Sequence, residues 1–450
     1  MMRRFEGVWP LFLVAALACG DSPSETEPEP DPEPEPTAGE ASLQLTLAGE
    51  PVADRELHVS RTDGSFQETV VTDADGWATA EIDGEGLFTI DDDGLGFITS
   101  IVISPGEELT FALQGDNGPI WVLEPSSVEL EGAGYYEYTS CEGQTHPEYS
   151  PELYATGSCV DGDGQMDAIA LAYSAQPNDG GEVVGYQLAS KALSTEALED
   201  TITFSGEWLT DFATISAYVT GLPVGFELGR VEVGLIKGDQ VFRSVDFRTY
   251  DPTEPVPYVP GFADDLSVLV EIEQSSGSRT SITQLASLGA EYEGSEFLPV
   301  MTGSLEASSQ PWSLSWAGGA DGASVMVLYL DSQDEVGLWR VVGPAGPVTV
   351  SLPVLPANVG LSYPESAQFA TAYVSTVDFP DAGGYSEASQ LGRLSDLGSG
   401  RFSEVARRLV RDGQRLRESF TSVSTLDVPA SQMLQDRALR ELDERLRQRR

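Results

Sequence analysis

A two-residue alternation of apolar and polar side chains recurs along most of this chain and restricts its fold to one rich in β-strands. Leu43, Leu45 and Leu47 alternate with polar neighbours, and the same period returns at residues 215–219 and 231–235. Successive side chains of a strand point to opposite faces, so this period predicts strands with one buried face. The 46 Gly and 28 Pro residues between such runs indicate many short strands joined by turns.

The length of 450 residues exceeds what one hydrophobic core supports, so we expect about three domains. An apolar fraction of 40% favours packed cores over disorder. We divide the folded part into residues 41–114, 118–300 and 301–380. Further strand-like runs lie at 266–272, 280–285, 324–330, 338–342 and 348–352.

The N-terminus has the layout of an export signal. Arg3 and Arg4 precede an apolar run at residues 7–18, which is shorter than the about 20 residues needed to span a bilayer. The sequence Ala16-Leu17-Ala18-Cys19-Gly20 resembles the lipobox of bacterial lipoproteins, although Ala stands where that family prefers Leu. The resemblance implies removal of residues 1–18 and lipidation of Cys19. The alternative is a signal peptide cleaved after Ala18 without lipidation.

Residues 19–40 alternate proline with carboxylates. Proline fixes φ and like charges repel, so we expect an extended linker of about 3.1 Å per residue, on the order of 60 Å in all.

Export also bears on the other two cysteines, Cys141 and Cys159, since disulfides persist in oxidising compartments. We predict that they pair; two unpaired buried thiols are the alternative.

Two segments resemble known β-sandwich modules. Residues 41–114 carry Gly49-Glu50-Pro51-Val52 and the turn Thr72-Asp73-Ala74-Asp75-Gly76-Trp77-Ala78, which are similar to motifs of immunoglobulin-like and carboxypeptidase-regulatory-like domains. Residues 301–380, with alternating Trp312, Leu314 and Trp316, resemble a fibronectin type III module. The resemblance implies tandem antiparallel β-sandwiches.

The C-terminal segment, residues 386–450, changes to a period of about 3.6. Its first apolar series is Phe402, Val405, Leu409, Leu416 and Phe420, and its second is Leu439, Leu442 and Leu446. This period predicts an Arg-rich helical hairpin. Three possibilities stay open: the helices dock on the body, pair with each other, or bind another protein. We favour docking on the body because of their opposite charge.

The charge is strongly negative and unevenly distributed. The formal net charge is −49, but residues 401–450 contain 12 Arg against 8 acidic residues, which gives that segment about +4 and the remainder about −53. Such a body repels nucleic acid, which excludes that class of partner, and attracts cations or basic proteins.

The best candidate ligand site is a loop with Asp161, Asp163 and Asp167. It resembles the calcium loops of FG-GAP and thrombospondin-like repeats, although the first aspartate of that pattern falls on Cys159. The resemblance implies oxygen ligation of Ca²⁺. The alternative is an acidic turn beside a disulfide.

Catalytic motifs are scarce. His58 and His146 are the two histidines, and we expect His58 to face solvent from a strand. We find no nucleophile elbow, zinc-protease helix or phosphate-binding loop. We therefore expect a protein that is not an enzyme. An exposed tryptophan face formed by Trp312, Trp316 and Trp339 would suit sugar stacking, but tryptophans of β-sandwiches more often lie in the core.

Together these features predict a lipoprotein of a Gram-negative cell envelope, anchored to the outer membrane through Cys19. It would act as a binding or adhesion module for an envelope protein or polysaccharide. The alternatives are a scaffolding subunit of an envelope assembly and an exported hydrolase that uses carboxylates with a metal.

Overall fold

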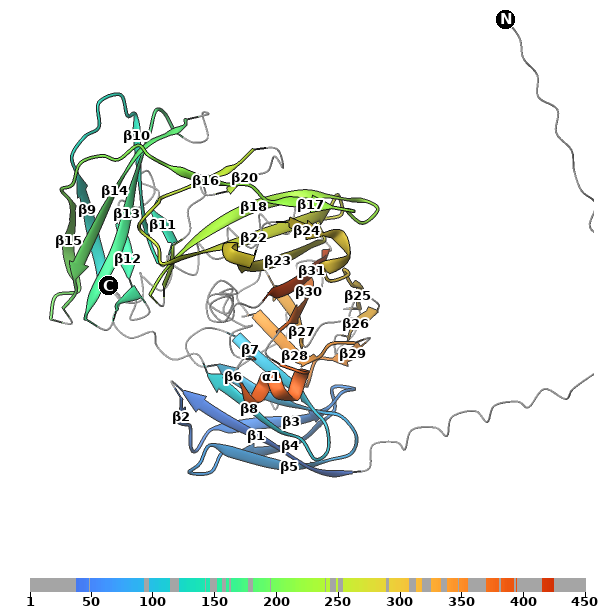
Figure 1. Ribbon diagram of the computed structural model, residues 1–450. Helices are drawn as coiled ribbons and strands as arrows, with labels where there is room; N and C mark the ends of the chain where they lie inside the picture. The colour runs from blue at the N-terminus through green and yellow to red at the C-terminus, as the bar shows by residue number, and fades with distance from the viewer. Residues whose placement is uncertain are drawn as a thin grey trace, which may run out of the picture. The chain divides into compact units, whose positions relative to one another are not determined.

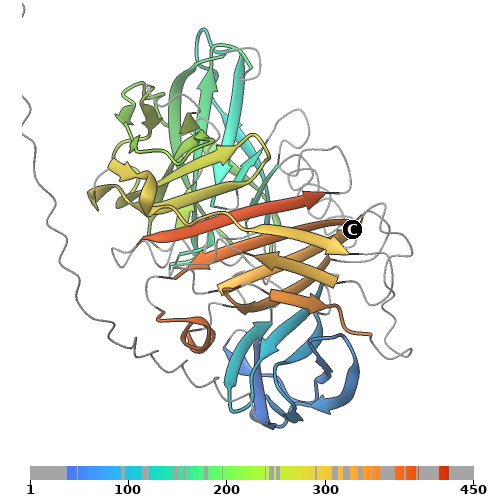
Figure 2. The same ribbon diagram turned by 90° about the vertical axis from the view of Figure 1, so that its right-hand side faces the viewer.

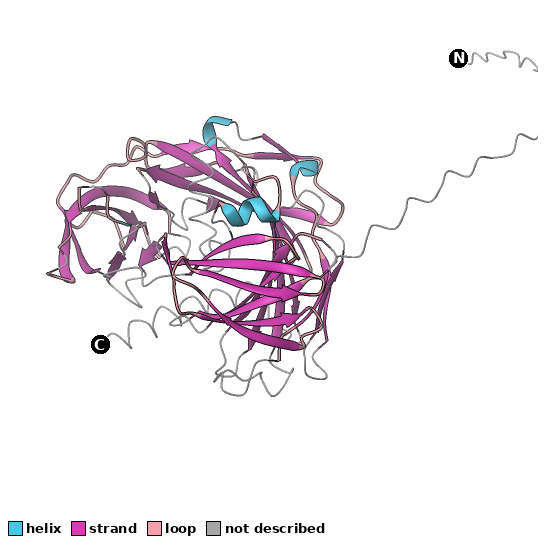
Figure 3. Ribbon diagram, turned by 90° about the horizontal axis from the view of Figure 1, so that it is seen from below, coloured by secondary structure: helices cyan, strands magenta, loops and turns pink. Residues whose placement is uncertain are grey.

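In the computed structural model of the protein, the regular secondary structure of the described residues is almost entirely β-strand (Figure 3), so the expectation of a mainly β fold is confirmed. One α-helix, α1 (Tyr385–Gln390), occurs in the described residues. The residues that the structure describes are 38–47, 49–92, 97–113, 121–141, 143–145, 152–155, 159–161, 163–176, 181–194, 196–238, 240–242, 248–249, 254–288, 291–306, 313–317, 325–332, 338–346, 348–354, 370–379, 382–391, 394 and 415–424.

The first region, residues 38–113, forms two groups of paired strands. One is a sheet in which β1 pairs with three strands: β1 (Gly39–Leu47), β2 (Glu50–Pro51), β5 (Trp77–Ile82) and the parallel β8 (Glu108–Leu113). The other has the order β7-β6-β3-β4: β3 (Glu56–Arg61), β4 (Phe66–Val71), β6 (Gly86–Asp92) and β7 (Phe97–Ile103). Leu43 and Leu45 of β1 share one buried cluster with Val59 and Phe88, so both groups contribute to a common core.

The predicted turn at Thr72–Ala78 is present before β5. The Asp73 Oδ1 atom accepts the backbone N–H groups of Asp75 and Trp77, both at 2.9 Å. Gly76 has φ of +79°, and a Cβ atom there would lie 2.5 Å from the carbonyl oxygen of Leu45. Only glycine fits this position without displacing β1.

The second region combines two further sheets with a larger core. One has the order β12-β9-β15 and the other β11-β10-β13-β14. Their strands are β9 (Trp121–Ser127), β10 (Tyr135–Ser140), β11 (Gly143–Thr145), β12 (Leu153–Ala155), β13 (Gln165–Tyr173), β14 (Val183–Ala192) and β15 (Glu199–Phe204). Leu123 and Leu171, on different sheets, belong to one buried cluster that also contains Val233 and Val270 of the strands that follow.

A continuous ladder of 13 strands joins distant segments within the described residues (Figure 1). Its order is β19-β18-β22-β23-β31-β30-β27-β28-β7-β6-β3-β4, with β20 on β18. The new strands are β18 (Phe226–Lys237), β19 (Gln240–Phe242), β20 (Arg248–Thr249), β22 (Asp265–Gln274), β23 (Arg279–Leu285), β27 (Val325–Ser332), β28 (Leu338–Pro344), β30 (Ala370–Asp378) and β31 (Leu416–Ser424). Pairing therefore continues across the expected domain boundaries, which stay a prediction.

The remaining described strands form small sheets: β16 (Ala213–Ile215) with β21 (Val256–Tyr258), β17 (Tyr218–Thr220) with β24 (Glu291–Glu293), and β25 (Thr302–Glu306), β26 (Ser313–Ala317) and β29 (Val348–Ser351) together.

The C-terminal helix expected through Leu416 and Phe420 is wrong in that part, because these residues lie on strand β31 (Figure 2). Leu416 pairs with Thr283 of β23, and Phe420 pairs with Ser375 of β30. Residues four apart share a face in a helix and in a strand, so this spacing could not separate the two. The rest of the expected hairpin, residues 395–414 and 425–450, lies outside the described residues.

Candidate functional site

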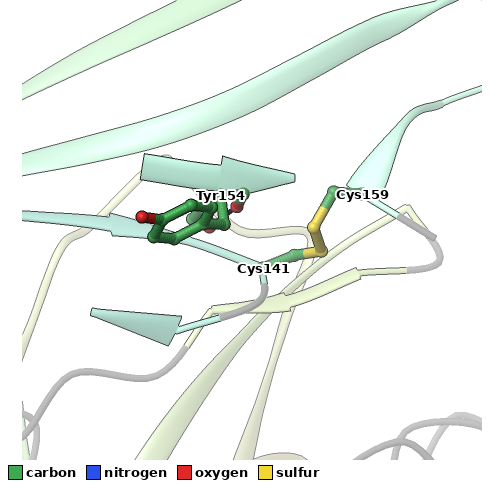
Figure 4. The surroundings of a disulfide bond; sticks show 4 residues. Cys141, Tyr154 and Cys159 are labelled. Atoms are coloured by element: carbon green, nitrogen blue, oxygen red, sulfur yellow. Dashed lines mark hydrogen bonds between the residues drawn. A yellow bond between two sulfur atoms is a disulfide. The ribbon is translucent and has the colours of Figure 1, made fainter. Parts of the chain in front are cut away.

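The two cysteines predicted to pair form a disulfide bond (Figure 4). Cys141 directly follows β10, and Cys159 precedes β13, with Cα atoms 5.5 Å apart. Both side chains are buried in the second core. Beside the bond, the Ser140 hydroxyl donates to the carbonyl oxygen of Tyr154 on β12 at 2.9 Å. The disulfide therefore connects the end of β10 to the segment before β13, and the Ser140 hydrogen bond connects the two sheets of the region.

Two aspartates of the predicted calcium loop, Asp161 and Asp167, contact other groups of the protein. Asp161 Oδ1 accepts the backbone N–H groups of Asp163 and Gln165 at 2.9 and 2.8 Å, and Gly164 has φ of +77°. Asp161 therefore caps a tight turn into β13.

Asp167 points its carboxylate to other partners. Its Oδ2 atom lies 2.8 Å from Nζ of Lys237 on β18, and its Oδ1 atom accepts the Ser190 hydroxyl. The described residues contain no group of three His, Cys, Asp or Glu side chains arranged to hold a metal ion. The structure thus does not assemble the three aspartates, and calcium binding stays a prediction.

His58 does not face solvent as expected. Its side chain is 6% exposed, and its Nδ1 atom lies 3.0 Å from the Thr69 hydroxyl on the neighbouring strand β4. Strand β3 is paired on both sides, and its residues from Leu57 to Ser60 are all buried. Burial on both faces overrides the alternation from which exposure was inferred. His146 lies outside the described residues.

Trp339 takes the core position rather than an exposed one. Its side chain is 6% exposed, and its Nε1–H donates to the Ser100 hydroxyl at 3.1 Å. It is therefore no platform for a sugar. The side chains of Trp312 and Trp316 lie outside the part of the chain that the structure describes.

Ion pairs hold the start of strand β31. The Arg417 guanidinium binds Asp378 on β30, with Nε 2.8 Å from Oδ2, and Arg415 pairs with Glu296. Burial raises the pKa of Glu296, but the backbone N–H of Glu293 and the charge of Arg415 outweigh it and lower the pKa. Arg415 and Arg417 of the basic C-terminal segment thus contact acidic residues of the body. Contact with the body is what docking of this segment implies, but these residues lie at a strand and not on the expected helix.

A pocket of about 390 Å³ was not foreseen from the sequence. Strands β7 and β28, the turn before β8 and the start of α1 form it. Its lining residues include Val102, Ser104, Glu107, Pro344, Tyr385 and Glu387.

Two groups lining this pocket are fixed by backbone contacts. The buried Tyr385 hydroxyl donates to the carbonyl oxygen of Val102 at 2.9 Å, and burial together with the charge of Glu107 raises its pKa well above the usual value. Glu387 Oε2 accepts the Gly383 N–H at 2.7 Å. No sequence motif marks these positions, because they are brought together from segments about 280 residues apart.

Comparisons with known proteins give little guidance. No family model and no curated protein matches the chain. Among solved structures, the Bacillus anthracis TIE protein is similar at 10% identity, over 57% of this chain and 49% of that one, with a TM-score of 0.15. A streptococcal ancillary pilin (11% identity, 55% and 95% covered) and the pneumococcal glycogen-degrading virulence factor SpuA (7%, 75% and 36%) each have a TM-score of 0.14.

This chain thus spans about half the length of the TIE protein. The structural likenesses at these TM-scores are weak. Within the described residues, no helix is both long and apolar enough to cross a membrane.

Proposed function

We propose that this protein is a lipid-anchored, non-catalytic binding or scaffolding protein of the bacterial cell envelope. The observation that carries the location is the buried disulfide Cys141–Cys159, since such bonds persist mainly outside the cytoplasm. The basic and apolar leader and the lipobox-like sequence ending at Cys19 support export and anchoring. The acidic linker of residues 19–40 would hold the folded part away from the membrane surface.

A binding function rather than catalysis is supported by the contacts of the histidine, cysteine and lysine side chains that the structure describes. His58 is buried against Thr69, and the two cysteines are joined to each other. Both lysines of the chain are paired with aspartates, Lys191 with Asp200 and Lys237 with Asp167. A protein with a formal net charge of −49 suits a cationic partner.

Anchoring is tested by fractionating cells that express the wild type or Cys19→Ala. The lipidated wild type should sediment with membranes and incorporate labelled palmitate, and the variant should do neither, because a diacylated cysteine holds a protein stably at a bilayer. Thiol labelling of the denatured, non-reduced protein should leave Cys141 and Cys159 unmodified. A wild type that is soluble, unlabelled by palmitate and carries free thiols would contradict the proposal.

The exported hydrolase is the second candidate, because Glu107 and Glu387 line the same pocket and carboxylate pairs can act as acid and base. It predicts turnover of a panel of p-nitrophenyl esters and glycosides that the double variant Glu107→Gln/Glu387→Gln abolishes. Absence of turnover by the wild type supports the non-catalytic assignment.

A further inference from the structure

The pocket beside α1 has the chemistry of a cation site. Two of its lining residues, Glu107 and Glu387, are acidic, and none of the described residues that line it is Lys, Arg or His. An anionic ligand would find no opposite charge there. The apolar side chains of Val102 and Pro344 also line it and suit the aliphatic stem of a long basic side chain.

Both carboxylates keep an oxygen for a ligand. Glu107 Oε2 accepts the Ser104 N–H at 2.8 Å, and Glu387 Oε2 accepts the Gly383 N–H at 2.7 Å. These contacts fix the two side chains, and neither Oε1 atom has a hydrogen bond to a residue that the structure describes. Neither carboxylate forms an ion pair with a described residue, in contrast to Asp378, which is paired with Arg417.

The pocket is also held in shape before any ligand arrives. Tyr385 lines it, is buried, and has its hydroxyl 2.9 Å from the Val102 carbonyl and 3.3 Å from that of Val342. These two contacts connect α1 to both β7 and β28. Because the tyrosine and both carboxylates are already positioned, binding costs little ordering of the protein.

We propose that this pocket binds the guanidinium or ammonium group of an arginine or lysine side chain on a partner protein. The inference rests on the proposed binding function and names the class of ligand. It predicts recognition of basic segments by a built site rather than by the diffuse negative charge of the body.

The test measures fluorescence anisotropy of a labelled, end-capped peptide of alternating glycine and arginine, titrated with the full-length protein. Citrulline peptide, which is neutral and nearly isosteric, is the ligand control, and a lysine peptide compares the two cation types. The citrulline peptide should bind about tenfold more weakly than the arginine peptide, because its neutral side chain loses the charge contacts with Glu107, which is partly buried, and Glu387, which is exposed.

Matched protein variants separate the pocket from the general charge. Glu107→Gln/Glu387→Gln keeps both backbone contacts through its amide oxygens and should weaken arginine binding about tenfold. Glu108→Gln, which removes a single charge from an exposed side chain that does not line the pocket, should weaken it less than about twofold, because only the diffuse, screened charge of the body changes. Glu107→Gln alone and Glu387→Gln alone should each weaken arginine binding more than Glu108→Gln does.

Three results would overturn the inference: equal binding of arginine and citrulline peptides, equal losses in Glu108→Gln and in each pocket variant, or no binding of either cationic peptide. Circular dichroism melting confirms that each variant is folded. Membrane fractionation of Cys19→Ala tests anchoring separately. A failure of the pocket inference can therefore be distinguished from a failure of the proposed anchoring.

Discussion

Strands β1 and β31 lie near opposite ends of the described chain, and they differ in how their sequences specify them. β1 alternates strictly, with Ala41, Leu43 and Leu45 buried and their polar neighbours more exposed. Its antiparallel partner β5 lies about 30 residues away in sequence. β31 shows no such alternation, since the adjacent charged residues Arg417 and Glu418 follow Leu416 directly. It pairs with β23 more than 130 residues earlier and is held by the ion pair of Arg417 with Asp378.

The difference shows where local pattern stops specifying structure. In β1 the alternation of buried and exposed residues agrees with the observed strand pairing, so the strand can be predicted from its own sequence. In β31 the spacing of Leu416 and Phe420 fits a helix equally well, and the decision is made by partners that meet only in the folded chain. Tertiary context therefore sets the conformation of β31.

The largest expected effect comes from removing β31. Deleting residues 415–450 takes out a strand paired on both edges and with it the buried side chains of Leu416 and Phe420, which contribute about 2–5 kcal/mol each. We expect urea unfolding at a much lower midpoint or loss of cooperative unfolding. Deleting only residues 425–450 keeps β31 and is the control. Equal stability of the two truncations would mean that β31 contributes nothing to the fold.

A smaller effect is expected from the core face of β1. Leu45→Ala removes a fully buried side chain and should lower the free energy of unfolding by about 2–5 kcal/mol. Leu47→Ala, on the same strand but 40% exposed, should cost less than about 1 kcal/mol. Chemical denaturation of both variants measures the difference. If they are equally destabilised, the alternation does not report burial in β1.

The smallest effect concerns pH and Glu418 on β31. Burial raises the pKa of this carboxyl, and the nearby Arg279 only partly opposes the rise. A carboxyl with a raised folded-state pKa binds its proton more tightly in the folded protein, so stability is lost as pH rises from the unfolded value of 4.5 through the folded one. Each pKa unit corresponds to about 1.4 kcal/mol.

Glu418→Gln should remove this loss, so its stability relative to the wild type should increase over that pH window and then level off. Urea midpoints measured from pH 4 to pH 8 check the trend. The conservative change keeps an oxygen that can accept the Ser375 hydroxyl, which Glu418 Oε1 accepts at 3.0 Å. A difference that does not vary with pH would show that Glu418 does not titrate in this range.

Much of the fold could be predicted from the sequence, because strand alternation and turn chemistry are local. The strands around Val233, Val270 and Ile282 and the turn capped by Asp73 follow from their own residues. The pairing of Cys141 with Cys159 required only the count of cysteines and the inference of export. The order of strands in the large sheet required contacts between segments hundreds of residues apart, which no local pattern contains.

The candidate sites were less predictable, for the same reason. The ion pair of Asp167 with Lys237 could not be predicted, because Lys237 lies 70 residues further along the chain. The burial of His58 could not be predicted from its neighbours, because it depends on the covering of both faces of strand β3 by distant parts of the chain. The pocket beside α1 combines Glu107 and Glu387, which share no motif and meet only through tertiary structure.

The position of β31 between β23 and β30 has a consequence for how the chain is made. Synthesis proceeds from the N-terminus, so both neighbouring strands are produced before the strand that fills the space between them. Until residue 424 has emerged, each presents an unpaired row of backbone donors and acceptors, which is a template for aggregation. The ladder can therefore close only after residues 416–424 have been made, however early its other strands pair.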